Sequence, residues 1–348
     1  MYTETVRQDT KRLWNLLSPD FPDWLNEYID TPAMLRLHGI SMVSGDNYTH
    51  LFDNVIHYPQ DSLDHSIGVA LIVWHFTRNK KQTLAGLFHD ISTGTFKHTL
   101  DFLNGDYMTQ ESTEELTTEI INNSDELMAL LARDNIDVGE VDDYHMYSIA
   151  DNDTPQLSAD RLEYSLDNMT RRYHFADFKT IQKFYNDLSI QTDENGNDEI
   201  GFSDIKLARE FVRLTTLCSL DYRSNETIFS MQVLSDILNK ALKNGDVKQE
   251  DFYTLTEKDI IKKLEHSSVS ESVKKWRQLE KIERSKEHPP INTYYVHHSA
   301  KLRWIDPLVN NKRVSKIDSK SKAFIDKNFN TDFDFYVYAD GILESDLI

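Results

Sequence analysis

AGLFHDISTGTFKH, residues 85–98, places His89 and Asp90 side by side at the end of an apolar run. A carboxylate directly after Ala-Gly-Leu-Phe is costly to bury unless a partner binds it. Neighbouring residues on a helix point about 100° apart, so both side chains can bind one ligand only at a corner of the fold where the ligand lies between them. The pair therefore predicts a bound metal ion, because a divalent cation accepts an imidazole and a carboxylate together.

Two further residues extend this pair to a mixed nitrogen and oxygen ligand set. His65 lies near the start of the apolar stretch DHSIGVA, and Asp160 opens the later stretch SADRLEY. Such a set suits one divalent ion, Fe, Mn or Zn, and Mg or Ni are also compatible. Four protein ligands leave room for water or substrate only at five- or six-coordinate ions, which favours Fe or Mn over closed tetrahedral Zn. The alternatives are hydrogen-bonded core histidines, and a helix-capping carboxylate for Asp160.

Composition limits the partners of the chain. Its 348 residues are 39% hydrophobic and carry a net charge of −20. A surface this acidic is expected to repel nucleic-acid polymers and anionic membranes, but a small phosphorylated substrate can still meet local positive charge. The single cysteine, Cys218, the absence of an apolar leader, and the short longest apolar run at 67–76 predict a cytoplasmic protein.

The hydrophobic pattern predicts a mainly α-helical chain with a small α+β C-terminal appendage. Helices are expected over 30–43, 64–76, 81–91, 110–134 (two helices) and 158–173, with more from 225 onward. The stretch 188–202 around Asn195 and Gly196 predicts a tight hairpin. A calcium loop starting at Asp193 is rejected, because its sixth position must be glycine and is Asp198.

The C-terminal end differs from the rest of the chain. The stretches 291–309 and 331–341 alternate aromatic and polar residues as strands do, and a turn-rich stretch, 310–322, separates them. We place the last boundary near 286–290. The expected domains are a core over 1–224, a helical extension over 225–288, and a small β-containing region over 289–348.

The order His, His-Asp, Asp resembles the HD superfamily of metal-dependent phosphohydrolases. Within it, the chain most resembles the deoxynucleoside triphosphate triphosphohydrolases. Six segments are similar in order and span nearly the whole chain: IDTPAMLRLHGIS (29–41), LDHSIGVA (63–70), AGLFHDISTGTFKHTLD (85–101), SADRLEY (158–164), FYTLTEKDII (252–261) and KLRWIDPLV (301–309). The resemblance implies an HD-domain helical core.

The resemblance also assigns roles to individual residues. It implies that the metal ligands are His65, His89, Asp90 and Asp160. It makes His98 a histidine near the substrate phosphates, Asp101 and Glu111 acidic residues that orient the catalytic machinery, and Arg161 and Tyr164 phosphate contacts.

Four positions depart from the family pattern. Ser62 stands for an arginine, Thr93 for a histidine, Gln110 for the active-site histidine before Glu111, and Met42 for a glutamine that contacts the sugar. The metal cage is thus retained while the triphosphate grip is missing. Glutamine cannot shuttle a proton, so Gln110 can bind substrate but not act as acid or base.

These residues together predict a hydrolase that acts on a nucleotide or a similar small phosphoester by metal-activated water. His98, Lys97 or Arg161 would neutralise charge on the phosphate oxygens, and Asp101 or Glu111 would position the water or protonate the leaving group. For Lys97 a solvated surface lysine is the favoured interpretation. For Glu111 the competing role is that of a carboxylate in the first turn of its helix, where the helix dipole stabilises a negative charge.

Two alternatives remain at this stage. One is a deoxynucleoside triphosphate triphosphohydrolase with a rearranged site. The other is a catalytically silent nucleotide-binding regulatory protein. Members of the resembled family form multimers, so the resemblance allows a homo-oligomer.

Overall fold

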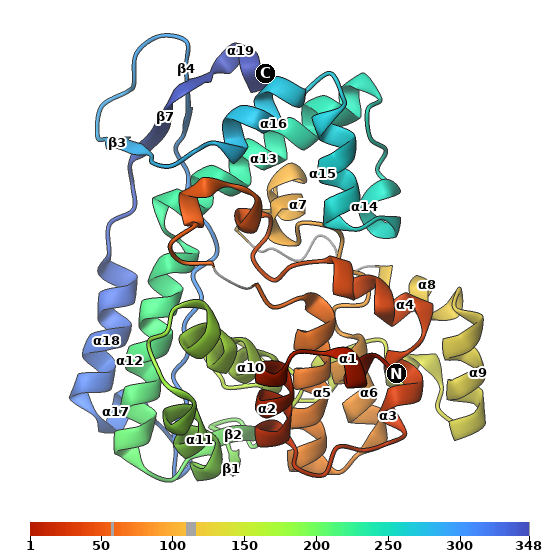
Figure 1. The fold of residues 1–348 in the computed structure, drawn as a ribbon. Helices are drawn as coiled ribbons and strands as arrows, with labels where there is room; N and C mark the ends of the chain where they lie inside the picture. The colour runs from red at the N-terminus through yellow and green to blue at the C-terminus, as the bar shows by residue number, and fades with distance from the viewer. Residues whose placement is uncertain (57–58, 109–115, 348) are drawn as a thin grey trace.

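The computed structural model describes residues 1–56, 59–108 and 116–347 (Figure 1). The fold is mainly α with a small α+β C-terminal region, as predicted. The N-terminal part contains helices α1 (Tyr2–Thr5), α2 (Gln8–Leu17), α3 (Leu25–Ile29), α4 (Pro32–Leu35), α5 (Ser62–Thr77), α6 (Lys80–Phe88), α7 (His98–Leu103), α8 (Thr117–Asn122), α9 (Asp125–Asp134), α10 (Ala159–Asp167), α11 (Phe178–Asp187) and α12 (Ile205–Tyr222). The remaining helices are α13 (Asn225–Asn244), α14 (Asp251–Thr254), α15 (Glu257–Glu265), α16 (Ser270–Arg277), α17 (Val314–Ile317), α18 (Ser319–Asn330) and α19 (Glu344–Leu347).

Helix α5 is the central helix of the N-terminal part. Its residues are apolar on nearly every side, so its first twelve residues are buried. The side chain of Asp61 caps the helix by accepting a hydrogen bond of 2.8 Å from the backbone N–H of Asp64. Helices α6 and α10 both pack against α5, and this arrangement brings three separate parts of the sequence together.

Two small sheets complete the fold. Strands β1 (Leu188–Thr192) and β2 (Asp198–Phe202) form the predicted antiparallel hairpin, and β2 pairs in parallel with β5 (Leu308–Val309), which pairs with β6 (Lys312–Arg313). The second sheet has the order β3 (Glu283–Ser285), β7 (Tyr336–Leu343), β4 (Thr293–Val296).

Two hydrophobic cores result, and the C-terminal segment contributes to both. Ile305, Val309 and Ile325 pack with the core built by α5, α6 and α10, whereas the strands of the second sheet pack with α13 and α16. In Figure 1 the blue C-terminal chain accordingly runs along the lower part of the molecule and then up to β7. On its way between the two cores the chain contributes Arg303 and Trp304 to a pocket that His65 of α5 and Asp160 of α10 also line.

Two predicted segments differ from the structure. The helix expected over 30–43 is confined to α4 and one 3-10 turn, Arg36–Gly39, because the backbone then becomes extended and Ser41 bridges to Asp61. The stretch expected to be turns, 310–322, contains α17 and the start of α18, which Asp318 caps through the N–H of Ser321. Among the described helices, none is long and apolar enough to cross a membrane.

Candidate metal centre

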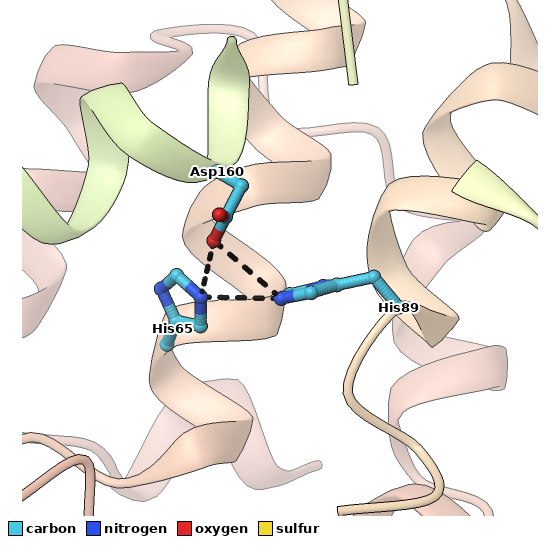
Figure 2. Close-up of side chains that lie close together, drawn as sticks. All are labelled: His65, His89 and Asp160. Carbon is cyan, nitrogen blue, oxygen red and sulfur yellow. Dashed lines mark hydrogen bonds and ion pairs between the residues drawn. The ribbon is translucent and has the colours of Figure 1, made fainter. Parts of the chain in front are cut away.

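Three side chains from three helices converge on one point, as Figure 2 shows. His65 lies in the first turn of α5, His89 directly follows α6, and Asp160 lies in the first turn of α10. The Nε2 atom of His65 is 3.2 Å from Nε2 of His89 and 3.0 Å from Oδ1 of Asp160. Nε2 of His89 is 3.8 Å from the same Oδ1. Both histidines are buried, and Asp160 is partly exposed to the cleft beside them.

Hydrogen bonds behind the two rings fix their orientation. Nδ1 of His65 lies 2.5 Å from Oε2 of Glu163, a fully buried carboxylate whose Oε1 accepts a hydrogen bond of 2.8 Å from Gln60. Nδ1 of His89 donates to the carbonyl oxygen of Gly86 at 2.8 Å. When Nδ1 carries the proton, Nε2 carries the lone pair, so both rings present a metal-binding nitrogen to the same point.

The electrostatics of this point favour a cation. Burial opposes a charge on His65, but the carboxylates of Glu163 and Asp160 outweigh it and raise the pKa of the imidazole to about 10, so a metal ion at Nε2 would replace a proton there. Donor atoms that share one ion at about 2.1 Å with bond angles of roughly 90–130° lie about 3.0–3.8 Å apart. The three measured separations fall in this range, so the residues fit a divalent metal ion.

Asp90, the fourth expected ligand, lies at the edge of this group. Its Oδ2 is 3.7 Å from Nε2 of His89 and is bonded to Nζ of Lys97, and its Oδ1 accepts a hydrogen bond of 2.9 Å from Thr93. Metal binding by Asp90 therefore stays a prediction. The favoured interpretation of Lys97 as a solvated lysine is wrong, because its side chain is buried and paired with this carboxylate.

His98 lies between a carboxylate and a guanidinium. Its Nδ1 lies 2.9 Å from Oδ2 of Asp101, and its Nε2 accepts a hydrogen bond of 3.2 Å from the guanidinium of Arg303. Burial lowers the pKa of His98, which agrees with a neutral ring that donates through Nδ1. Asp101 is 1% exposed and does not line the cleft, so it reaches the cleft through His98.

The two expected phosphate contacts on α10 have different surroundings. The guanidinium of Arg161 already donates to Oδ1 of Asp151 at 2.9 Å and to Oδ1 of Asn152 at 2.7 Å. Tyr164 lines the cleft, and burial raises its pKa to about 12, which keeps the hydroxyl protonated as a donor. Gln110 and Glu111, the expected substrate-binding and catalytic residues of the next segment, lie outside the described residues.

A cleft opens over these side chains. Its volume is about 350 Å³, and an adjoining, more apolar chamber has a volume of about 110 Å³. Residues shared by the two linings are Met42, His98, Tyr164, Lys301 and Arg303. The lining of the cleft contains His65, His89 and Asp160, four basic side chains (Lys97, Arg161, Lys301 and Arg303) and three further aspartates (Asp90, Asp151 and Asp153).

Sequence reasoning missed three of these residues. Glu163 could have been found, because it lies three residues after Asp160 on one helix face and therefore faces the same way. Lys301 and Arg303 belong to the segment KLRWIDPLV, for which the family resemblance implies no role of the basic residues. No local signal places them beside His98, which is more than 200 residues earlier in the chain.

Comparison with known proteins agrees with this fold. The chain matches no protein-family model. It is 25% identical over 293 residues to an uncharacterized protein of Bacillus subtilis, and the aligned part covers 82% of this chain and 83% of that protein. It is 22% identical over 290 residues to a protein of Cordyceps militaris named a metal-dependent phosphohydrolase, with 81% and 79% covered.

Two solved structures share the fold across nearly the full length. A phosphohydrolase from Bacteroides thetaiotaomicron superposes with a TM-score of 0.56 at 12% identity, covering 91% of this chain and 96% of that one. A hypothetical protein from Aquifex aeolicus superposes with a TM-score of 0.62 at 13% identity, covering 92% and 93%.

Proposed function

We propose that this chain is a metal-dependent phosphohydrolase of the HD type that acts on a nucleotide or a similar small phosphoester. The observation that carries the proposal is the convergence of His65 Nε2, His89 Nε2 and Asp160 Oδ1 in the lining of a cleft that also contains basic side chains. The names of the Cordyceps and Bacteroides relatives support a phosphohydrolase in general. The nucleotide substrate rests on the sequence resemblance and on the size of the cleft.

His65, His89 and Asp160 would hold the ion, with Asp90 next to them. A divalent ion held there would supply a Lewis acid for a phosphoryl oxygen and a water molecule of lowered pKa. The chain's own groups would do the rest. Lys97 and Arg303 would neutralise charge on the non-bridging phosphate oxygens, and the Tyr164 hydroxyl would donate a hydrogen bond to the substrate.

His98 would have a positioning role in this scheme. Asp101 fixes its Nδ1–H, so its Nε2 faces Arg303 and orients that guanidinium toward the cleft. The adjoining chamber, lined in part by Tyr164, Tyr222 and Met231, would take the organic part of the substrate.

The test is product analysis on the purified chain. Mn, Fe, Co, Ni, Zn and Mg would be supplied in turn with a panel of nucleoside mono-, di- and triphosphates. Asp160→Asn removes a ligand charge at a helix start without changing the volume, and it should abolish turnover. Asp204→Asn is the matched control, because Asp204 caps α12, lies outside the cleft lining, and should leave turnover unchanged.

The products separate the remaining alternatives. Phosphate released from a monophosphate would support a phosphomonoesterase. Release of tripolyphosphate would instead support a deoxynucleoside triphosphate triphosphohydrolase with a rearranged site. Absence of turnover with every metal, while one equivalent of metal and a nucleotide still bind, would refute the hydrolase and favour a regulatory nucleotide-binding protein.

A further inference from the structure

The carboxylate of Asp90 is fully engaged by side chains of its own loop. Thr93 donates to Oδ1 at 2.9 Å, and the ammonium of Lys97 is bonded to Oδ2. The same Oδ2 lies 3.7 Å from Nε2 of His89, one of the nitrogens that face the proposed metal position. This oxygen lies outside the group of donor atoms formed by His65, His89 and Asp160, so it can bind the same ion only after it leaves Lys97 and moves toward that group.

The backbone holds Lys97 in this place. Phe96 and Lys97 both have positive φ, 67° and 41°, a conformation that side chains other than glycine adopt only when the surroundings enforce it. The surroundings here are a fully buried Phe96 ring and a hydrogen bond of 3.2 Å from the N–H of Phe96 to Oε1 of Glu257. The chain therefore directs a lysine into the metal pocket, where its side chain is 7% exposed.

Lys97 and a divalent ion are competitors for Asp90. A buried ammonium needs a negative partner, so Lys97 leaves Asp90 at low cost only if another anion replaces it. Lys97 lines the same cleft as His65 and His89, so a phosphate group that enters the cleft can be that anion. When the anion takes Lys97, the Oδ2 oxygen of Asp90 becomes available to the ion.

We propose that Lys97 couples anion binding to metal binding by exchanging Asp90 for a phosphate group. The inference rests on the proposed metal site and adds a regulation of that site: the ion binds tightly only when a phosphorylated ligand is present. Coupling between two ligands is reciprocal, so the ion increases the affinity for phosphate by the same factor. Lys97 is a positioning residue for the ion in this scheme and a direct contact for the anion.

The experiment measures Mn²⁺ affinity, not activity. The metal-free chain is titrated with Mn²⁺ at increasing inorganic phosphate, and free Mn²⁺ is followed by its EPR signal. We expect phosphate to raise the Mn²⁺ affinity of the wild-type chain by about tenfold. In Lys97→Met, affinity without phosphate should already be raised by a similar factor, and phosphate should add little.

Two further variants separate this exchange from simpler causes. Lys301→Met removes a positive charge from the same cleft, while Asp90 stays bound to Thr93 and Lys97. It therefore measures the effect of charge alone, which should be smaller than the effect of Lys97→Met. Adding Asp90→Asn to Lys97→Met should remove the gain in affinity, because the gain comes from the freed carboxylate.

Several results would overturn the inference. The exchange is excluded if Lys97→Met binds Mn²⁺ no more tightly than Lys301→Met does. It is also excluded if phosphate raises the Mn²⁺ affinity of Lys97→Met as much as that of the wild-type chain. Lys97→Gln is a second neutral variant if the methionine variant fails to fold by circular dichroism. If no variant binds Mn²⁺ with or without phosphate, the proposed metal centre itself fails. Metal binding without phosphate coupling rejects the exchange alone and leaves the hydrolase proposal intact.

Discussion

Gly68 on α5 is where the packing behind the metal centre can be tested most sharply. It lies three residues after His65, so it is on the same side of the helix. A Cβ atom at Gly68 would stand 2.6 Å from Cγ and 2.6 Å from Oε1 of Glu163. Glu163 is fully buried and holds Nδ1 of His65, so it has no solvent-facing space to move into. Gly68→Ala must therefore displace the carboxylate that orients the ring.

The expected effect is opposite to that of an ordinary helix glycine. Replacing glycine by alanine inside a helix usually stabilises by about 1 kcal/mol. Overpacking a filled core costs about 1–3 kcal/mol, which offsets or outweighs the helix gain. We expect Gly68→Ala to lower the free energy of unfolding by up to about 2 kcal/mol. Loss of the bond that orients His65, a ligand in the proposed metal centre, should lower the Mn²⁺ affinity about 10–100-fold.

Gly86→Ala is the matched control. Gly86 is on α6, and its carbonyl oxygen still accepts the hydrogen bond from His89 after substitution. The added Cβ would come no closer than 3.2 Å to a side-chain methyl of Val73, which can shift. Urea unfolding and Mn²⁺ titration should place this variant within about 1 kcal/mol of wild type with near-normal metal affinity. A Gly68→Ala chain that is as stable as wild type and binds Mn²⁺ equally well would refute the reasoning.

Three other changes have defined outcomes. Glu163→Gln keeps the volume but removes the charge beside His65, so Mn²⁺ affinity should fall about 10–100-fold while circular dichroism stays unchanged. Ser158→Ala removes the cap of α10, which accepts from the N–H of Arg161 at 3.2 Å, and should cost about 1 kcal/mol in urea unfolding. Burial raises the pKa of Asp46 from 3.8 to about 8, so the folded chain retains a proton there that the unfolded chain has lost. The free energy of unfolding of the wild-type chain should therefore decline as pH rises from about 4 to about 8. In urea unfolding, Asp46→Asn should become more stable relative to the wild-type chain as pH rises from about 5 to about 8.

The helices that carry the metal centre were predictable because their local signals agree with their burial. The run around 64–76 is apolar on nearly every side and becomes α5, and Ser158 caps the start of α10. The hairpin at β1 and β2 was predictable from Asn195 and Gly196. In these segments short-range pattern and tertiary packing favour the same structure.

The environment of Lys97 was not predictable in this way. A lysine between Phe96 and His98 gives no sign of burial, since the same letters occur on exposed loops. Its position follows from the positive φ angles of Phe96 and Lys97 and from Glu257, which lies 161 residues after Phe96. The carboxylate of Glu257 accepts a hydrogen bond from the N–H of Phe96. α18 was missed for a related reason. Its serine and lysine residues resemble a loop, and the helix is fixed by the Asp318 cap and an ion pair with Arg209.

The charge distribution links these local features to the choice of substrate. The chain has a net charge of −20, and the lining of the cleft holds four basic side chains (Lys97, Arg161, Lys301 and Arg303) beside four aspartates (Asp90, Asp151, Asp153 and Asp160). Charges separated by more than about 8–10 Å in physiological salt are largely screened, so a small anion inside the cleft responds to the nearest cations rather than to the whole protein. A polyanion must also bring its other phosphates close to the acidic surface, where each is repelled. We therefore expect this cleft to favour small phosphoesters over polyanions, because an acidic surface would act only weakly on a single phosphate.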